Sequence, residues 1–212
     1  MAKQPGGILQ GITGKIGNVV GSSWNGISVL RQAPSPGRTR FSRPQIEQQA
    51  RFILLTRFLR PVSELLNQTF KRSAKKMSCF NKAFSVNKET VNGLYPSFKI
   101  NYASVMLSSG NLPNAGNIKT SSPKPGYLLL SWNTERSPRF SALGADQVFI
   151  ALYCEDLERW FCHFNSTRRD AGSCSLDLSD FKGRQVQAYM GFIAENGKKA
   201  SNSLYLGKLN IS

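Results

Sequence analysis

Histidine and closely spaced cysteine pairs are what this chain of 212 residues has least of. It contains one histidine, His163, and four cysteines with no CxxC spacing among them: Cys79, Cys154, Cys162 and Cys174. A structural zinc site needs about four Cys or His ligands, usually in local pairs. We therefore expect no metal site and no cofactor.

Long apolar segments are also absent. The first residues, MAKQPGG, lack the apolar region of a signal peptide, and no stretch of about 18 apolar residues occurs in the chain. We expect neither a signal peptide nor a transmembrane segment, and no membrane partner. A cytoplasmic or virion-associated protein with free thiols is the expectation that follows.

Acidic residues are scarce in the first part of the chain. The sequence holds 28 Lys and Arg against 12 Asp and Glu, a net charge of +16. Residues 1–125 hold 18 of these cations against three acids, a balance of +15, whereas residues 126–212 balance to +1. Such a surplus destabilises a compact monomer by self-repulsion, so a polyanionic partner is the natural hypothesis. The asymmetry favours a molecule in two parts, one of them basic.

The N-terminal segment GKIGNVVGSSWNGISVLRQ mixes small residues with β-formers and contains no acid. Asn25 and Gly26 separate two β-forming runs and predict a hairpin turn, because a type I′ turn needs positive φ at both central positions. We expect a β-hairpin arm over residues 8–32, with Trp24, Asn25 and Gly26 as its interaction residues. Its recurring glycines indicate either close packing against another chain or ordinary turns and bulges.

A linker rich in proline and basic residues, APSPGRTRFSRP, follows the arm and precedes a helix predicted over residues 43–76. Ser42 and Gln45 have the spacing of a capping box at the start of this helix. Pro61 should kink or split it, because proline removes a hydrogen bond and clashes with the preceding turn.

The predicted helix carries a basic stripe. At 100° per residue four cations fall within about 60° of one another, provided that the kink preserves the helical phase: Arg57, Arg60, Lys71 and Lys75. Apolar residues would back this stripe at Ile53, Leu54, Phe58, Leu65 and Leu66. The stripe is either a solvated surface, which is the commoner case, or a ligand-binding face.

The middle of the chain predicts a helix over residues 79–92 and a strand over 97–107. The segment SSGNLPNAGNIKTSSPKPG has the composition of a linker and places a domain boundary near residue 120. The sequence thus divides into a basic region, residues 1–120, and a second domain, residues 121–212.

The second domain is β throughout by its pattern, with six or seven short strands in about 90 residues, which is typical of a β-sandwich. A Trp on an early strand and the pattern L-x-x-F-x-G-x-x-V-x-A-Y before the penultimate strand resemble a fibronectin type III module. Six residues are expected in its core: Trp132, Val148, Ile150, Val186, Ala188 and Tyr189. The fold class is therefore mainly β with a helical segment: a hairpin arm, a kinked helix and a fibronectin type III-like or immunoglobulin-like sandwich.

The chain as a whole resembles a family of small basic proteins from Bacteroidetes that is known as a domain of unknown function. Four segments carry the resemblance: GGILQGITGKIGNVVGSSWNGISVLR, QARFILLTRFLRP, NGLYPSFKINYASVMLSSGNLPNAG and YMGFIAENGKKASNSLYLGKL. The linker GRTRFSRP departs from the plainer turn of that family. The resemblance implies an organisation in two parts and transfers no activity or catalytic residue.

The residues offer little for catalysis. His163 lies on a predicted strand between aromatic residues, and no Ser or Cys nucleophile can be placed beside it, so a structural histidine is the better interpretation. The acid pairs Asp156/Glu158 and Asp177/Asp180 fall in predicted turns, where acids are ordinarily solvated. We expect no enzyme; an enzyme of unknown type is the remote alternative.

Binding to nucleic acid has a physical basis, because each Lys or Arg that neutralises a phosphate releases condensed counterions. The candidate polyanion-binding residues are Arg38, Arg40, Arg43, Arg57, Arg60, Lys71, Arg72, Lys75 and Lys76. Trp24 and Phe41 are candidates for stacking on unpaired bases. No helix-turn-helix, RNP or zinc-finger pattern is present, so recognition of a base sequence is not expected.

A structural role is the competing hypothesis, because an arm that adds its strand to a neighbour's open sheet edge is a common device of assemblies. We expect self-association or a protein partner through residues 8–32. The leading hypothesis unites both ideas: a non-catalytic structural or assembly protein whose basic half contacts a polyanion, nucleic acid above all. The alternative is a protein-interaction, surface-lattice or virion module with no nucleic-acid role.

Overall fold

The computed structural model describes residues 2–3, 12–24, 26–35, 40–74, 76–134 and 144–211. The chain divides into two compact units, residues 1–43 and 44–212. The prediction placed the boundary near residue 120, and the reason for the difference lies in the core of the second unit.

The first unit is a small antiparallel sheet in the order β1-β4-β3-β2. Its strands are β1 (Ala2–Lys3), β2 (Gly14–Ile16), β3 (Val19–Trp24) and β4 (Ile27–Gln32). The predicted hairpin is confirmed by the pairing of β3 with β4, in which Trp24 stands opposite Ile27. Gly26 has a φ of +75°, as the turn requires. Asn25 and the side chain of Trp24 lie outside the described part of the structure.

One glycine of this sheet is required by a close approach. A Cβ atom added to Gly21 would lie 2.3 Å from the carbonyl oxygen of Ile12, because the backbone before β2 passes directly over β3. The close approach at Gly21 is therefore a contact within the unit itself, and packing of the N-terminal glycines against another chain stays a prediction.

We expect the substitution Gly21→Ala to destabilise this sheet by about 1–3 kcal/mol, since the added methyl group would overlap backbone that has no rotamer with which to yield. Hydrogen exchange should show faster exchange of the β3 and β4 amides, with the second unit unchanged. The control is Gly116→Ala, where a Cβ would meet nothing within 4 Å. Unchanged protection in β3 and β4 would contradict the close approach.

The second unit begins with helices. They are α1 (Arg43–Leu59), η1 (Arg60–Val62), α2 (Ser63–Thr69), α3 (Cys79–Asn87) and η2 (Lys88–Thr90). The kink expected at Pro61 is confirmed, because the α-helix stops at Leu59 and one 3₁₀ turn containing Pro61 precedes α2. The helix predicted to reach residue 76 ends at Thr69.

The burial of α1 differs in part from the expected pattern. Leu55, Phe58 and Leu59 are buried, but Ile53, expected behind the basic stripe, is 63% exposed. Ile53 lies near the opposite side of the helix from Leu55, two residues or about 200° away. The helix is therefore apolar on its inner face and also carries isoleucine on its outer face.

The strand expected over residues 97–107 is mostly replaced by other structure. Only β5 (Val91–Asn92) and β6 (Lys99–Ile100) pair here, and the 3₁₀ turn η3 (Tyr102–Ser104) follows. The prediction was wrong beyond Ile100, because the chain turns where Tyr189 donates a hydrogen bond of 2.9 Å to the Tyr102 carbonyl.

The remaining strands form an antiparallel β-sandwich, as predicted. One sheet has the order β10-β9-β12-β13 and the other the order β11-β8-β7. The strands are β7 (Lys119–Ser121), β8 (Tyr127–Ser131), β9 (Gln147–Cys154), β10 (Arg159–Arg168), β11 (Ser173–Asp177), β12 (Gln185–Ile193) and β13 (Leu204–Asn210). The protein is mainly β with a helical segment. Strand β7 lies in the stretch that had been assigned to a linker.

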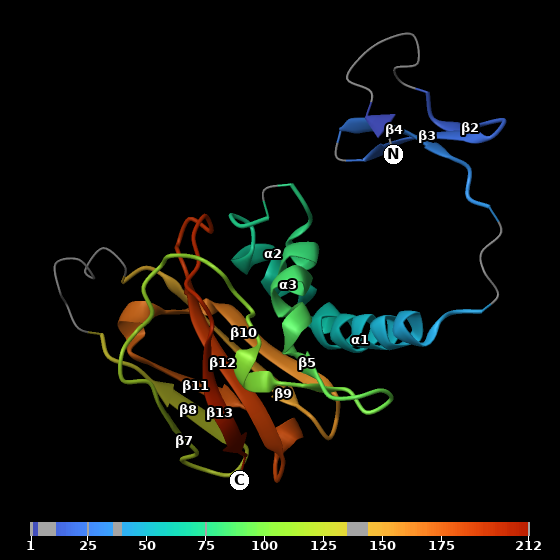
Figure 1. Cartoon of the computed structure of the whole chain (residues 1–212). Coiled ribbons are helices and arrows are strands. Elements are labelled where there is room, and N and C mark those ends of the chain that lie inside the picture. Colours follow the sequence, from blue (N-terminus) through green and yellow to red (C-terminus); the bar gives the residue numbers. More distant parts are fainter. Residues whose placement is uncertain are drawn as a thin grey trace. The chain divides into compact units, whose positions relative to one another are not determined.

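Two hydrophobic cores lie on opposite faces of the sheet β10-β9-β12-β13. Val148, Ile150 and Leu152 belong to the core between the two sheets, whereas Phe149 and Tyr153 belong to the core beneath the helices. Figure 1 shows the helices on the side of this sheet away from β7, β8 and β11. The helices share a core with β9 and β12, and this is why residues 44–120 join the sandwich in one unit.

All six residues expected in the sandwich core are buried. Five of them pack between the two sheets. Tyr189 instead faces the helices, where its ring centroid lies 5.9 Å from that of Trp160.

Candidate functional site

The register of the N-terminal sheet places two cations on one face. Lys15 of β2 stands opposite Val20 of β3, and Val20 stands opposite Arg31 of β4, so the three residues form one row across the sheet. Side chains in such a row point to the same face, and two strand spacings separate Lys15 from Arg31 by about 10 Å. Both are exposed. We call Lys15 and Arg31 the cation row.

The opposite face of the same sheet is apolar at its edge. Ile16 and Val19 stand opposite each other in the pairing of β2 with β3 and are 62% and 45% exposed. Since their side chains point away from the face of Lys15, Ile16 and Val19 form an exposed aliphatic edge on the face opposite the cation row.

This unit contains six Lys or Arg residues and no acid. The cations of the cation row are therefore not balanced by any carboxylate within residues 1–43. The prediction did not single out Lys15 or Arg31, although the alternation of the hairpin was a signal that could have placed them on one face.

The predicted polyanion-binding residues are dispersed over several elements. Arg38 and Lys75 lie outside the described residues. Arg40 is exposed shortly before α1, and Arg43 is exposed at its first position. Arg60 is exposed in η1, and the exposed cations of the loop between α2 and α3 are Lys71, Arg72 and Lys76. No described acidic side chain forms an ion pair with Arg60 or with the three loop cations.

The prediction of a continuous basic stripe along one kinked helix was wrong. It required helical phase from Arg57 to Lys75, but α2 ends at Thr69 and Lys71 lies in the turn that follows. The basic residues of this region instead stand on a 3₁₀ turn and a loop.

Arg57 also differs from its prediction, because its guanidinium donates a hydrogen bond to the carboxylate of Glu158 and forms an ion pair with it. This pair joins α1 to the turn between β9 and β10. An acid from the nearly neutral part of the chain thus neutralises one of the predicted polyanion-binding cations.

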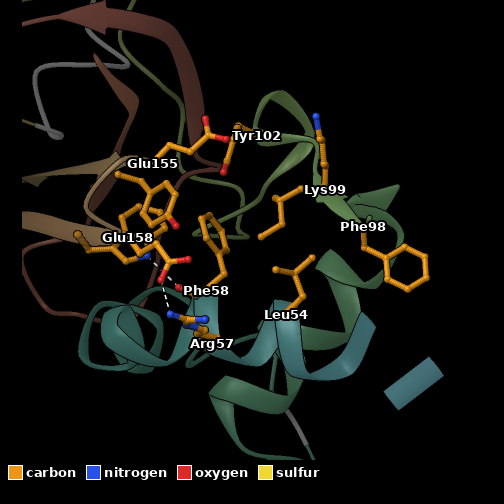
Figure 2. Close-up of a pocket in the computed structure, with 11 residues that line it drawn as sticks. Leu54, Arg57, Phe58, Phe98, Lys99, Tyr102, Glu155 and Glu158 are labelled. Atoms are coloured by element: carbon orange, nitrogen blue, oxygen red, sulfur yellow. Dashed lines mark hydrogen bonds and ion pairs between the residues drawn. The ribbon is translucent and has the colours of Figure 1, made fainter. Parts of the chain in front are cut away.

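The Arg57–Glu158 pair lies at a cavity of about 290 Å³ in the second unit. Figure 2 shows the cavity between α1, the segment around Tyr102 and the turn that follows β9. Its aromatic wall is tightly packed: the ring centroid of Phe58 lies 4.8 Å from that of Tyr153 and 4.9 Å from that of Trp160. The indole of Trp160 donates a hydrogen bond of 2.8 Å to the carbonyl of Phe58, which fixes the wall to the end of α1.

Two phenols of this wall are held in their neutral form. Burial raises the pKa of Tyr102, and the negative charges of Glu155 and Glu158 raise it further. The pKa of Tyr153 is raised by burial and then by the same two carboxylates. The cavity therefore combines neutral aromatic walls with carboxylates at its edge.

The only histidine lies in a polar cluster that the prediction did not anticipate. His163 Nε2 lies 3.1 Å from Thr167 Oγ1, 3.1 Å from Ser166 Oγ and 3.6 Å from Cys174 Sγ. Strand β10 supplies the first three residues and β11 supplies Cys174. The register of β10 against β9 shifts between His163 and Thr167, and a shift of this kind re-aims the side chains beside it.

The cluster makes a prediction about pH. Burial lowers the pKa of His163 below its unfolded value, so the unfolded chain binds a proton first as the pH falls. His163 should therefore stabilise the protein more at pH 8 than at pH 5.5, relative to the His163→Gln variant. Urea unfolding of both proteins at both pH values measures the difference between their free energies of unfolding. The contributions of the other titrating groups cancel in that difference. A difference that is constant with pH would contradict the assignment.

Among the described residues, the exposed large apolar side chains all lie in the basic part of the chain. In the described structure they are Ile16, Val19, Ile27, Phe41, Ile46, Phe52, Ile53, Met77, Leu94 and Tyr95. None belongs to the sandwich strands, so apolar exposure and positive charge both concentrate before residue 96.

The described residues contain neither a candidate metal site nor a candidate membrane span. No group of three or more His, Cys, Asp or Glu is placed to hold a metal ion. In the same residues, no helix combines the length and the apolar character needed to cross a membrane.

Comparisons with known proteins place the chain without assigning chemistry to it. The model of a family described as "Family of unknown function (DUF6266)" matches residues 11–207. No curated protein matches the chain significantly. A solved structure, the fibronectin type III domain of the human collagen alpha-1(XX) chain, is 14% identical, with 50% of this chain and 89% of that chain covered at a TM-score of 0.36. The family match spans both the cation row and the cavity.

Proposed function

The chain belongs to DUF6266, a family of unknown function, and we propose that it is a non-catalytic structural or assembly protein whose basic N-terminal half contacts a polyanion. The polyanion is nucleic acid, bound without sequence specificity. The observation that carries the proposal is the cation row: Lys15 and Arg31 share one face of a sheet in a unit that contains no acid.

The geometry of the cation row suits a charged backbone. The two side chains are exposed, and their strands set them about 10 Å apart. Flexible cationic side chains at this spacing can reach successive phosphates, and each contact releases counterions from the nucleic acid. Phosphate contacts position a protein on nucleic acid and carry no information about base sequence.

The second unit adds exposed cations between residues 60 and 76. Arg60 on η1 and Lys71, Arg72 and Lys76 on the loop between α2 and α3 are exposed and form no ion pair with a described residue. Unpaired exposed cations are available to a polyanion at no cost from broken internal ion pairs. Arg57 is paired with Glu158, so a polyanion that contacts Arg57 would have to displace that carboxylate.

The proposal predicts a specific change in salt dependence. The double substitution Lys15→Gln and Arg31→Gln should lower the affinity for a mixed-sequence oligonucleotide and reduce the log–log salt slope by about 1.8 for duplex DNA, from 0.9 per contact. Fluorescence anisotropy between about 50 and 200 mM salt measures both quantities.

The matched control is the double substitution Lys198→Gln and Lys199→Gln, which removes the same charge from an exposed turn near β13. It should leave the slope nearly unchanged. Equal effects of the two double variants would show that net charge alone acts, and would overturn the role of the cation row. Binding that does not depend on salt would remove the polyanion altogether.

A second candidate function is a protein-interaction, surface-lattice or virion module, with self-association through residues 8–32. The observation that favours it is the apolar edge of the N-terminal sheet, where Ile16 and Val19 are adjacent and exposed. Exposed aliphatic residues that adjoin each other can contribute to a surface that contacts another chain.

The Bacteroidetes origin of the family stays a prediction.

This candidate has its own test. The double substitution Ile16→Ser and Val19→Thr should weaken self-association by about tenfold, because both side chains would lose their burial in the contact. Sedimentation velocity over a range of protein concentrations measures it. Ile27→Thr, a change of an exposed residue on the opposite face of the sheet, should have little effect. A wild-type protein that stays monomeric at all concentrations would refute this candidate.

A further inference from the structure

The cavity at the end of α1 is independent of the cation row, because all its lining residues belong to the second unit. Its volume of about 290 Å³ is near the lower end of ligand-binding pockets, which suits a ligand about as large as one amino-acid side chain.

The walls of the cavity are fixed before any ligand arrives. The indole of Trp160 is hydrogen-bonded to the carbonyl of Phe58, and the hydroxyl of Tyr189 donates to the carbonyl of Tyr102 at 2.9 Å. The phenol of Tyr153 packs against both Phe58 and Trp160, which also contact each other. Because the cavity needs no rearrangement, little binding free energy is spent on ordering the protein.

Two carboxylates line the cavity, and only one of them is neutralised. Glu158 is paired with Arg57, whereas Glu155 forms no ion pair with any residue that the structure describes. Figure 2 shows the side chain of Glu155 beside Tyr102, while the ammonium of Lys99 points away from Glu158 and Phe58. The negative charge of Glu155 is therefore directed to the aromatic side of the cavity.

We propose that this cavity binds an organic cation of the arginine or lysine type, a guanidinium or primary ammonium on an apolar stem. The carboxylate of Glu155 accepts hydrogen bonds from the cation, and the rings of Tyr102 and Tyr153 contact the stem and the charged group. Aromatic faces attract such cations when the charged group lies within about 6 Å of the ring centroid.

The Arg57–Glu158 pair supports the choice of ligand. It shows that this group of carboxylates already binds one guanidinium at the edge of the same aromatic wall. A second guanidinium at Glu155 would repeat the same chemistry. The net charge of +16 does not exclude a cation, because at physiological ionic strength charges beyond about 8 Å are largely screened.

The test titrates the full-length protein with N-acetyl-arginine methylamide and with its neutral isostere, N-acetyl-citrulline methylamide. Isothermal titration calorimetry measures the affinity, and intrinsic tryptophan fluorescence, to which Trp160 in the cavity wall contributes, is the second readout. The arginine derivative should bind at least about tenfold more tightly, the usual effect of a charge-assisted hydrogen bond. Putrescine is the third ligand. Binding of putrescine would indicate a free polyamine as the source of the cation, and binding of the arginine derivative alone would indicate a polypeptide side chain.

Two variants of the same charge separate the cavity from its surroundings. Glu155→Gln should reduce the affinity for the arginine derivative by about tenfold. Asp156→Asn, in the adjacent turn position and paired with Arg184 at 3.8 Å, does not line the cavity and should bind as the wild type does. Both residues are exposed, so both variants should fold.

Equal binding of the arginine and citrulline derivatives would overturn the proposal, as would equal losses in Glu155→Gln and Asp156→Asn. The variant with Lys15→Gln and Arg31→Gln should bind the cation normally. The cavity and the polyanion surface can therefore fail independently of each other.

Discussion

Burial of one sheet on both of its faces is the constraint on which the second unit depends. Strand β9 alternates between two cores, with Ile150 turned toward the second sheet and Phe149 toward the helices. A strand that is apolar on both faces cannot leave either face to water, so the sheet requires a second sheet on one side and a helical layer on the other. The same alternation brings Tyr153 to the end of the helical core, where α1 and Trp160 complete the cavity.

The sequence was sufficient for elements whose signals are local. The turn at Gly26 follows from the φ angle that a tight hairpin requires, and the break after Leu59 follows from the missing amide of Pro61. The strands of the sandwich follow from short apolar runs bounded by turns. In each case a few neighbouring residues determine the backbone, so no distant contact had to be known.

The parts that the sequence did not reveal are contacts between distant residues. Arg57 and Glu158 are 101 positions apart, and neither carries a mark that distinguishes it from a solvated charge. The cavity, the polar cluster at His163 and the packing of the helices on β9 are of the same kind. The boundary was misplaced for this reason: composition detects a linker, but only the shared core shows that residues 44–120 cannot be separated from the sandwich.

The net charge of the chain does not describe the local charge at its two candidate sites. In the N-terminal sheet, the pairing of strands places Lys15 and Arg31 together where no acid of the unit can offset them. In the second unit, the turn after β9 places three carboxylates within residues 155–158, one of them beside neutral phenols. Because salt screens charges over about 8 Å, each site acts through its own few groups. A strongly basic chain can therefore carry a locally cationic surface and a locally anionic cavity, and the two proposed contacts, with a polyanion and with an organic cation, would be made by separate residues.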